Sequence, residues 1–328
     1  MRLEKWGVIL FSFLALQAGA QVFDLNPLSC FPFEPVFKNG YVVKNHIHSI
    51  HASIVYKRDN EAIQDKGLSK TWEYDSRGLL TRYYFTTIKG SVNKEVPHPA
   101  VFRRGRRISA AYMTEEPVYS YDTTFTDYLY NAQKQLLLRR TRDGDYYNTV
   151  YYEYDTQGNV RKESVYRETN ASENKNVFKL GVQNQLSQEE FRYEKLSTRQ
   201  FKCKHLNDEG KVFKETIFQY DSIGHLLEEN NSYTVSWMRS STHMTYDKSG
   251  KMLSKLAVSN ENGEESAKSV YKYTTENKVD VEDRYKGDEK YYELNYLYDK
   301  QTGMLTSHFI REELNKAIVI VKYSYDFY

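Results

Sequence analysis

The sequence predicts an all-β protein, built as an antiparallel array of β-hairpin repeats in an open or spiralling sheet. The first observation is a motif of the form aromatic-x-Tyr-Asp-x-x-Gly-x-Leu, which recurs about every 26 residues, a spacing typical of stacked supersecondary units. The second is the lack of proline from residue 118 to residue 328, expected where most backbone N–H groups donate to a sheet. The third is the presence of 30 tyrosines among 328 residues. This composition suits a sheet whose buried face is made largely of tyrosine rings, each of which keeps a polar hydroxyl group at its end.

Four copies of the motif are clear, at residues 72–80, 152–160, 218–226 and 244–252. Weaker copies are anchored at Tyr130, Tyr193, Tyr273, Tyr298 and Tyr325. Asn277 stands where glycine is expected, and asparagine is the next-best residue for a left-handed backbone. Lys134 occupies the same motif position and should cost about 1 kcal/mol if it is left-handed.

Each copy predicts a strand, a tight turn and a return strand. Trp72 and Tyr74 lie two positions apart, so both point to one face of a strand while Glu73 points to the other. The segment from Asp75 to Gly78 is typical of a type I turn, in which the aspartate bonds the backbone two residues on and the glycine is left-handed. Further turns near each half-period complete an antiparallel meander with cross-strand aromatic ladders.

The aspartates of the motif are predicted to be structural, because a reaction needs one site whereas every turn needs its own aspartate. Calcium binding by the row of turns is the less favoured alternative, since each turn offers a single carboxylate. The predicted structural turn residues are Asp75, Gly78, Asp155, Gly158, Asp221, Gly224, Asp247, Gly250, Asp299 and Gly303.

Residues 1–20 are typical of a secretory signal, with Arg2 and Lys5 before an apolar run and small residues up to Ala20. The apolar run is too short to span a bilayer, and we expect no transmembrane segment in the mature chain. Residues 21–49 are predicted to be an irregular lead-in, and residues 50–328 the hairpin-repeat domain. We therefore expect a secreted, periplasmic or cell-surface protein.

Cys30 and Cys203 are the only cysteines of the chain. In an oxidising compartment they could form a disulfide that pins the lead-in to the sheet. Two separate buried thiols are the alternative, and the sequence leaves both open because it does not give the geometry.

Two excursions interrupt the repeat, at residues 86–127 and 167–190. Each is either a binding segment on a rigid scaffold or a tolerated surface insertion. The first excursion carries Arg103, Arg104, Arg106 and Arg107, which form either a clamp for an anionic glycan or a solvated hairpin turn around Gly105. The near-equal totals of 46 basic and 44 acidic residues argue against a nucleic-acid partner.

The sequence contains no recognisable catalytic, phosphate-binding or dinucleotide-binding motif, so we expect no enzymatic activity and no cofactor. His46, His48 and His51 have a spacing that would allow zinc binding, although polar positions on an exposed strand explain them more simply. Stacked tyrosines can serve as sugar platforms, but the polar residues that alternate with them favour a core ladder.

The motif resembles the YD repeats of Rhs-type proteins, which also occur in large toxin shells and cell-surface proteins. The resemblance covers most of residues 66–328. It implies hairpins joined into a long spiralling sheet and, for some members, extracellular carbohydrate binding. The chain departs from that family in its short length, its longer period, and the lack of an Asp-Pro dipeptide and of a toxin-like C-terminal region.

These observations predict a non-catalytic exported binding or scaffold protein, whose partner is an envelope or extracellular polysaccharide or an envelope protein. The alternative is a toxin-associated or cargo-covering shell fragment that binds a partner protein. An outer-membrane barrel is disfavoured, because the outward positions of the predicted strands are mostly charged or polar.

Overall fold

The computed structural model describes residues 35, 37–58, 61–98, 101–103, 106–109, 112–174, 177–260 and 265–328. In this part of the chain one short helix, α1 (Asn39–Lys44), precedes twenty β-strands. The first ten strands are β1 (Ile47–Lys57), β2 (Gln64–Tyr74), β3 (Leu80–His98), β4 (Val101–Arg103), β5 (Arg106–Ser109), β6 (Tyr112–Tyr130), β7 (Leu136–Asp143), β8 (Tyr146–Tyr154), β9 (Val160–Asn170) and β10 (Leu180–Lys195). The others are β11 (Gln200–Leu206), β12 (Val212–Tyr220), β13 (Leu226–Tyr233), β14 (Arg239–Tyr246), β15 (Met252–Ser259), β16 (Glu265–Tyr273), β17 (Val279–Lys286), β18 (Glu289–Tyr298), β19 (Leu305–Glu312) and β20 (Ile318–Phe327).

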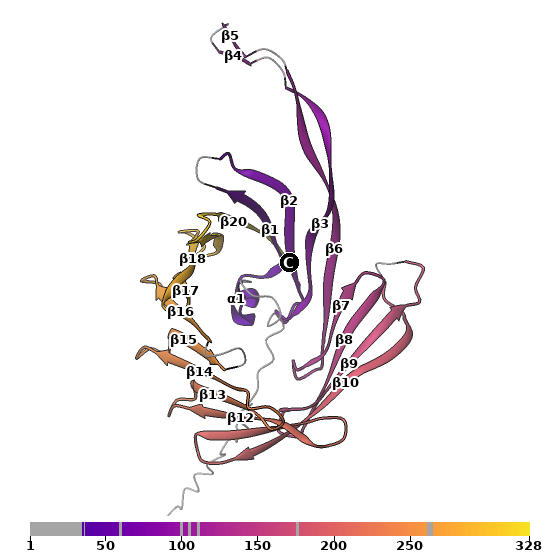
Figure 1. The fold of residues 1–328 in the computed structure, drawn as a ribbon, viewed down its shortest axis with the longest axis vertical. Helices are drawn as coiled ribbons and strands as arrows, with labels where there is room; N and C mark the ends of the chain where they lie inside the picture. Colours follow the sequence, from indigo (N-terminus) through magenta and orange to yellow (C-terminus); the bar gives the residue numbers. More distant parts are fainter. Residues whose placement is uncertain are drawn as a thin grey trace, which may run out of the picture.

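Eighteen of the described strands form one antiparallel sheet that closes into a barrel (Figure 1). Within this sheet each strand pairs with the next one of the sheet along the chain, so β3 pairs with β6, and β4 and β5 between them form a separate small hairpin. The barrel closes because β1 pairs with β2 on one side and with β20 on the other, where Ala52 lies opposite Tyr323 and Ile54 opposite Val321. The prediction of an open or spiralling sheet is therefore wrong. Closure pairs both edge strands, which would otherwise present unpaired backbone donors and acceptors.

The turns that follow the Tyr-Asp motif lie together at one end of the barrel, because successive antiparallel strands reverse direction. We call this end the Tyr-Asp end. In the turn after β12, Oδ1 of Asp221 accepts hydrogen bonds from the backbone N–H groups of Ile223 (2.9 Å) and His225 (2.8 Å). Gly224 follows with φ 96°, and at the equivalent positions Lys134 has φ 66° and Asn277 has φ 68°. The local sequence thus sets the same turn repeatedly.

The aromatic residues of the motif face the inside of the barrel. Figure 1 shows α1 within the ring of strands, and Phe37, just before α1, contacts Trp72 and Tyr323 at ring-centroid distances of 5.7 and 5.9 Å. Residues opposite each other in an antiparallel pair share a face, so the pairing registers extend this inward face around the wall. Its buried members include Trp72, Tyr74, Tyr83, Tyr128, Tyr152, Phe218, Met244 and Val321.

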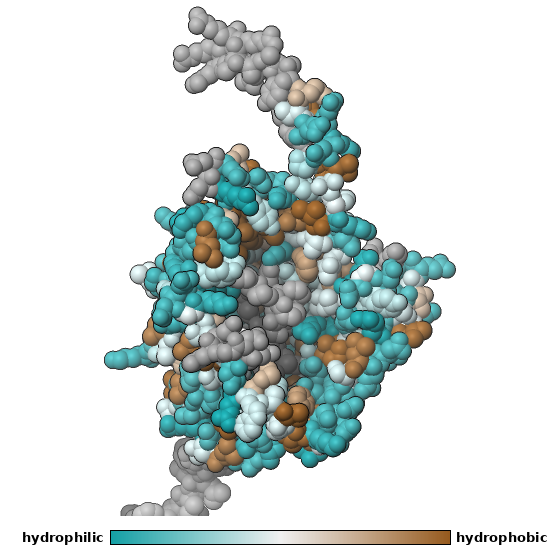
Figure 2. Space-filling view, in the orientation of Figure 1, coloured by the Kyte–Doolittle hydropathy of each residue, from teal (hydrophilic) through white to brown (hydrophobic). Residues whose placement is uncertain are grey.

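The outer face carries ion pairs between neighbouring strands. Examples are Arg82–Asp127 (2.6 Å), Lys202–Glu215 (3.3 Å) and Lys272–Asp283 (3.1 Å). Figure 2 shows a mostly hydrophilic surface with scattered apolar residues on the face turned to the viewer. Opposite charges on adjacent strands stabilise a sheet modestly and keep its outer surface wetted.

The two excursions from the repeat are extended hairpins. Strands β3 and β6 continue beyond the barrel as a long two-stranded ribbon, with β4 and β5 at its tip (Figure 1). Strands β9 and β10 run past their neighbours and connect through residues 171–179, where Phe178 packs on Tyr147 at 4.9 Å between ring centroids.

Glu168 fastens the second excursion to the outside of the wall. Its carboxylate is 0% exposed and accepts hydrogen bonds from Arg140 Nε (2.9 Å), Thr149 Oγ1 (2.6 Å), Tyr151 OH (2.7 Å) and Gln183 Nε2 (2.8 Å). Burial alone would raise the pKa of this carboxyl, but these hydrogen bonds lower it overall. A buried carboxylate with this many donors is a structural anchor.

The lead-in differs from its prediction. Residues 39–44 form α1, whose Val42 is buried, and β1 begins at Ile47 within the segment expected to be irregular. No side chain caps the N-terminus of α1, so packing inside the barrel stabilises this short helix more than its own sequence does.

Candidate binding cavity inside the barrel

In most repeats the anchor tyrosine, which lies at or near the end of the strand before the turn, joins neighbouring hairpins. The hydroxyl of Tyr273 donates to the carbonyl oxygen of Met252 (2.7 Å), at the start of the return strand of the preceding hairpin. The same bond recurs as Tyr154–Leu136, Tyr193–Val160, Tyr246–Leu226, Tyr298–Val279 and Tyr325–Leu305. We call these bonds tyrosine staples. They fix the rings in place, and burial raises the pKa of Tyr298 to about 12, so its phenol stays protonated as a donor.

Side chains from the preceding turn lie over several stapled rings at the Tyr-Asp end. His225 stacks on Tyr246 with 4.6 Å between ring centroids and an interplanar angle of 18°. The ammonium of Lys251 lies 5.4 Å from the ring centroid of Tyr273, and that of Lys278 lies 5.2 Å from the centroid of Tyr298. Each ring is therefore held by its hydroxyl and by a cation or an imidazole above it.

A cavity of about 640 Å³ lies between these tyrosines and the segment that includes α1. Its walls come from Pro35, Phe37, Lys38 and Tyr41 on one side and from β14 to β19 on the other. The aromatic lining residues are Phe37, Tyr41, Tyr246, Tyr271, Tyr273, Tyr296 and Tyr298. Sites for small ligands commonly have a volume of roughly 300–1,000 Å³ and combine apolar walls with a few polar groups.

Polar groups in the cavity are few and well defined. Oε1 of Glu282 accepts from Arg284 Nε (2.6 Å), and its Oε2 lies 3.4 Å from the hydroxyl of Tyr296. Burial, followed by the Glu282 carboxylate, raises the pKa of Tyr296. Lys38, Lys251 and Lys278 also line the cavity. This arrangement offers a ligand flat aromatic surfaces, one buried carboxylate and three cations.

A stack of three rings adjoins the cavity at Tyr296. His308 lies between Tyr296 and Tyr323, at 5.7 Å from each ring, and its Nδ1 is 2.8 Å from the Tyr323 hydroxyl. Burial, with smaller contributions from Lys70 and Arg284, lowers the pKa of His308 to about 4. The ring is therefore neutral at physiological pH and packs as an aromatic residue.

The predicted arginine cluster lies away from this cavity. Arg103 ends β4, and Arg106 and Arg107 begin β5, where Arg103 is opposite Arg106 and Phe102 is opposite Arg107. Arg104 lies outside the described residues. Figure 1 places this hairpin at the far end of the β3–β6 ribbon, so the cluster and the cavity cannot belong to one site.

The predicted turn residues lie at the Tyr-Asp end. The glycines at 78, 158, 224, 250 and 303 all have positive φ. The side chains of Asp75, Asp155, Asp247 and Asp299, like that of Asp221, accept backbone hydrogen bonds within their own turns. These carboxylates are thus engaged in turn geometry and are spread around the rim.

Cys203 and the three histidines share no site in the described residues. Cys203 is buried on the inward face, and burial raises the pKa of its thiol to about 12. Cys30, the other member of the possible disulfide, lies outside the described residues. The ring nitrogens of His51 contact Thr71 (3.0 Å) and Asp326 (2.8 Å), while His48 packs against Tyr328. In the described ranges no three His, Cys, Asp or Glu side chains are placed to hold a metal ion.

Sequence reasoning missed the part of the cavity that comes from the lead-in. Phe37 and Tyr41 stand in a segment without a repeat, and nothing in their spacing indicates that they enter the barrel. It also missed Glu282 and His308, because both fall at strand positions that show no motif. The tyrosines were recognised as a ladder, but their second role as a cavity wall depends on closure of the sheet.

Comparisons with known proteins give weak similarities only. No protein-family model matches the chain, and a search of curated proteins finds no match. Among solved structures, a porin-like protein from Bacteroides uniformis is similar at 12% identity and TM-score 0.37, over 86% of this chain and 97% of that chain. A porin-like protein from Bacteroides vulgatus gives 9% identity and TM-score 0.28, over 62% and 94% of the two chains.

A third solved structure, the Tc holotoxin pore of Photorhabdus luminescens, gives 13% identity and TM-score 0.26, over 78% of this chain and 15% of that chain. These low values establish neither a shared fold nor a shared activity. The resemblance to YD-repeat proteins stays a prediction. Within the described residues, no helix combines the length and the apolar character that crossing a membrane would require.

Proposed function

We propose that this protein is a non-catalytic exported binding protein whose barrel holds a glycan in the tyrosine-lined cavity. The observation that carries the proposal is the cavity wall, where Tyr246, Tyr273 and Tyr298 are fixed by staples and line a space of about 640 Å³. The apolar faces of pyranose rings pack on flat aromatic rings. Preorganised rings lose little conformational entropy on binding, which favours affinity.

The polar groups of the cavity suit a hydroxyl-rich ligand. The Glu282 carboxylate can accept hydrogen bonds from sugar hydroxyls, while Lys38 and Lys278 can donate to ring or hydroxyl oxygens. The cavity groups form no arrangement of nucleophile, base and orienting residue, since Glu282 is already held by Arg284. Ligand binding without catalysis is the activity that this site supports best.

The outer ion pairs support an aqueous environment for the barrel wall. Charged residues that face hydrocarbon cost several kcal/mol each near the bilayer midplane, on the order of 2–4. Pairs such as Arg82–Asp127 and Lys202–Glu215 lie on the outward face of neighbouring strands. We therefore propose a secreted or periplasmic location, consistent with the signal-like residues 1–20.

The test is binding of purified residues 21–328 to a panel of neutral envelope polysaccharides, at low and moderate salt. Lys38→Trp places a bulky group at the cavity wall, and Lys44→Trp, on α1 but outside the cavity lining, is the matched control. We expect saturable binding that Lys38→Trp weakens by about tenfold or more and Lys44→Trp leaves unchanged. Equal binding by both variants, or no binding to any glycan, would contradict the cavity assignment.

A partner protein is the second candidate, favoured by the β3–β6 ribbon. Val92 is 65% exposed and Met113 is 55% exposed on this projecting hairpin, where Val92 pairs with Val118. Apolar side chains on a two-stranded ribbon outside the core are suited to contact another chain. Crosslinking in the native envelope, with Val92→Ser and Met113→Ser as the test variant, would reveal a partner that is lost on substitution.

A further inference from the structure

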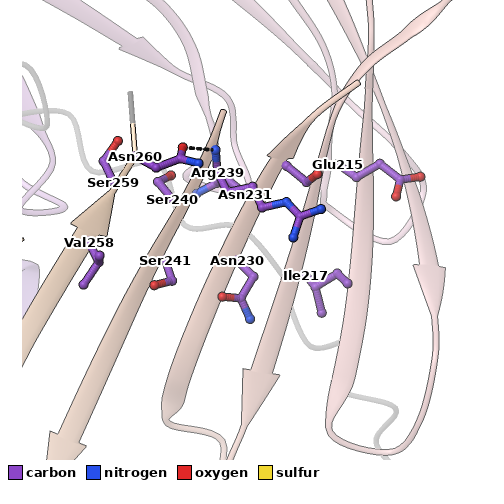
Figure 3. A pocket seen from close by; sticks show the side chains of 11 residues that line it. Glu215, Ile217, Asn230, Asn231, Arg239, Ser240, Ser241, Val258, Ser259 and Asn260 are labelled. Carbon is purple, nitrogen blue, oxygen red and sulfur yellow. Dashed lines mark hydrogen bonds between the residues drawn. The ribbon is translucent and has the colours of Figure 1, made fainter. Parts of the chain in front are cut away.

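A second cavity lies on the outer face of the barrel, across β12 to β15. Four residues in cross-strand register form its floor. Ile217 lies opposite Asn230, Asn230 opposite Ser241, and Ser241 opposite Val258 (Figure 3). Their chain neighbours Thr216 and Asn231 face inward and are hydrogen-bonded to each other (2.8 Å), so the floor row faces outward. The cavity has a volume of about 530 Å³, and we call it the outer groove.

The outer groove contains one uncommitted cation. Figure 3 shows the Arg239 side chain pointing from β14 over the neighbouring strands toward β12. Within the described residues its guanidinium forms no hydrogen bond and pairs with no carboxylate, while its backbone N–H donates to Asn260 Oδ1 (2.7 Å) and its backbone carbonyl accepts from Asn260 N–H (3.2 Å). The acidic residue of the groove, Glu215, is already paired with Lys202 (3.3 Å). The groove therefore favours an anionic group beside Arg239.

Uncharged polar groups make up most of the remaining lining. The side chains of Asn230, Ser232 and Ser241 form no side-chain hydrogen bond within the described part of the chain. An amide and two hydroxyls provide both donors and acceptors at an exposed surface. This chemistry matches a ligand rich in hydroxyl groups.

An exposed tryptophan lies in the loop before Arg239, where its backbone contacts Asn260 of the outer groove. Trp237 is 92% exposed, and it precedes Arg239 by two residues. Its carbonyl oxygen accepts from Asn260 Nδ2 (3.1 Å), while Thr234 N–H donates to the carbonyl of Phe213 (2.9 Å). The loop backbone is thus held by hydrogen bonds on both sides, while the indole itself is exposed to solvent. An exposed indole with a fixed backbone is a stacking platform for a sugar ring.

We propose that the outer groove and Trp237 form a binding site for an acidic oligosaccharide. The Arg239 guanidinium pairs with a uronic carboxylate, Asn230 and Ser241 bond sugar hydroxyls, and Trp237 stacks on a neighbouring pyranose ring. A nucleic acid is disfavoured, because it requires a track of cations along its phosphates and the groove offers one uncommitted arginine. This site is on the opposite face of the wall from the tyrosine-lined cavity and does not depend on it.

The experiment is calorimetric titration of residues 21–328 with short oligomers of galacturonate, glucuronate and mannuronate. Methyl-esterified oligomers, which lack the charge, are the matched ligands. We expect at least one uronate to bind, its methyl ester to bind at least about tenfold more weakly, and both Trp237→Ala and Arg239→Ala to weaken binding by about tenfold or more. Tryptophan fluorescence should change on binding in the wild type and not in Trp237→Ala.

Three control variants distinguish binding in the outer groove from a general effect of surface substitution and from binding in the tyrosine-lined cavity. Val235→Ala removes the other exposed apolar residue of the loop, which is 90% exposed, and Arg311→Ala removes an exposed arginine on β19. Lys38→Trp alters the tyrosine-lined cavity. All three should bind uronates like the wild type. The proposal is overturned if no uronate binds, if binding survives both Trp237→Ala and Arg239→Ala, or if Lys38→Trp abolishes it.

Discussion

Left-handed turn residues show how single positions fit this fold. Gly224 has φ 96°, and a Cβ atom added there would have no neighbour within 4 Å. Lys134 takes the same conformation with a full side chain. The difference between these positions is therefore one of backbone strain rather than of packing, since side chains beyond glycine disfavour positive φ.

Reciprocal substitutions test this strain. Gly224→Ala is expected to lower the free energy of unfolding by about 1–2 kcal/mol, because alanine is strained at φ 96°. Lys134→Gly is expected to raise it by a smaller amount, of about 0.5 kcal/mol, because glycine relieves the strain but loses more entropy on folding. Urea unfolding of both variants measures whether the free energy of unfolding falls for Gly224→Ala and rises for Lys134→Gly. A neutral Gly224→Ala would mean that the turn tolerates side chains freely.

His308 makes stability depend on pH. Its pKa is about 4 in the folded barrel and about 6.5 in an unfolded chain, so between these values the unfolded state binds more protons. Stability should fall as the pH drops from about 6.5 towards 4, by up to roughly 3 kcal/mol. His308→Gln should lose less stability between pH 7 and pH 4.5 than the wild type, as measured by urea unfolding at both values. The more exposed His243→Gln is the control, and an equal loss in all three proteins would contradict the assignment.

At the scale of elements, the tyrosine staples link each hairpin to the one before it. Backbone pairing alone joins the strands, but the hydroxyl of Tyr273 adds a bond to the Met252 carbonyl at the Tyr-Asp end. The same geometry recurs at Tyr246 and Tyr298. This recurring geometry explains why tyrosine, and not another aromatic residue, ends the strand before the turn in each of these copies, whether aspartate follows it, as at Tyr246 and Tyr298, or threonine, as at Tyr273.

Removing one staple should cost about 1 kcal/mol of stability. Tyr273→Phe keeps the ring but removes the hydroxyl, which leaves the Met252 carbonyl without this donor. Tyr146→Phe removes a hydroxyl from a ring that is 49% exposed and serves as the control. Thermal or urea unfolding of both variants makes the comparison. If the two variants have the same stability, the staple does not stabilise the fold.

At the scale of the whole molecule, closure of the sheet converts a linear array of hairpins into a barrel with an interior. Pairing of β1 with β20 leaves no unpaired edge in the eighteen-stranded sheet of the described residues and turns the aromatic faces of the hairpins toward a common interior. The tyrosine-lined cavity exists only because Phe37, Lys38 and Tyr41 lie opposite β14 to β19 within this interior.

A disulfide across the β1–β20 seam tests closure directly. Ser53 and Lys322 are opposite each other, and directly opposed residues on paired strands are close enough for a disulfide. Ser53→Cys with Lys322→Cys should form an intramolecular crosslink under mild oxidation. The pair Ser53→Cys with Lys272→Cys, which joins β1 to the non-neighbouring β16, should not. If the first pair stays reduced in folded protein, the barrel is not closed in solution.

The sequence by itself determined the repeating unit, because the interactions that form each turn and each strand face are local. Asp221 and Gly224 specify their turn within five residues, and alternation at Trp72 and Tyr74 specifies the buried face. Tertiary structure alone decided closure, since an identical hairpin can continue an open sheet or a closed one until β20 meets β1. It also decided the candidate sites. Phe37 reaches Trp72 only inside a closed ring, and the groove beside Arg239 needs the registers of four strands, which no single segment encodes.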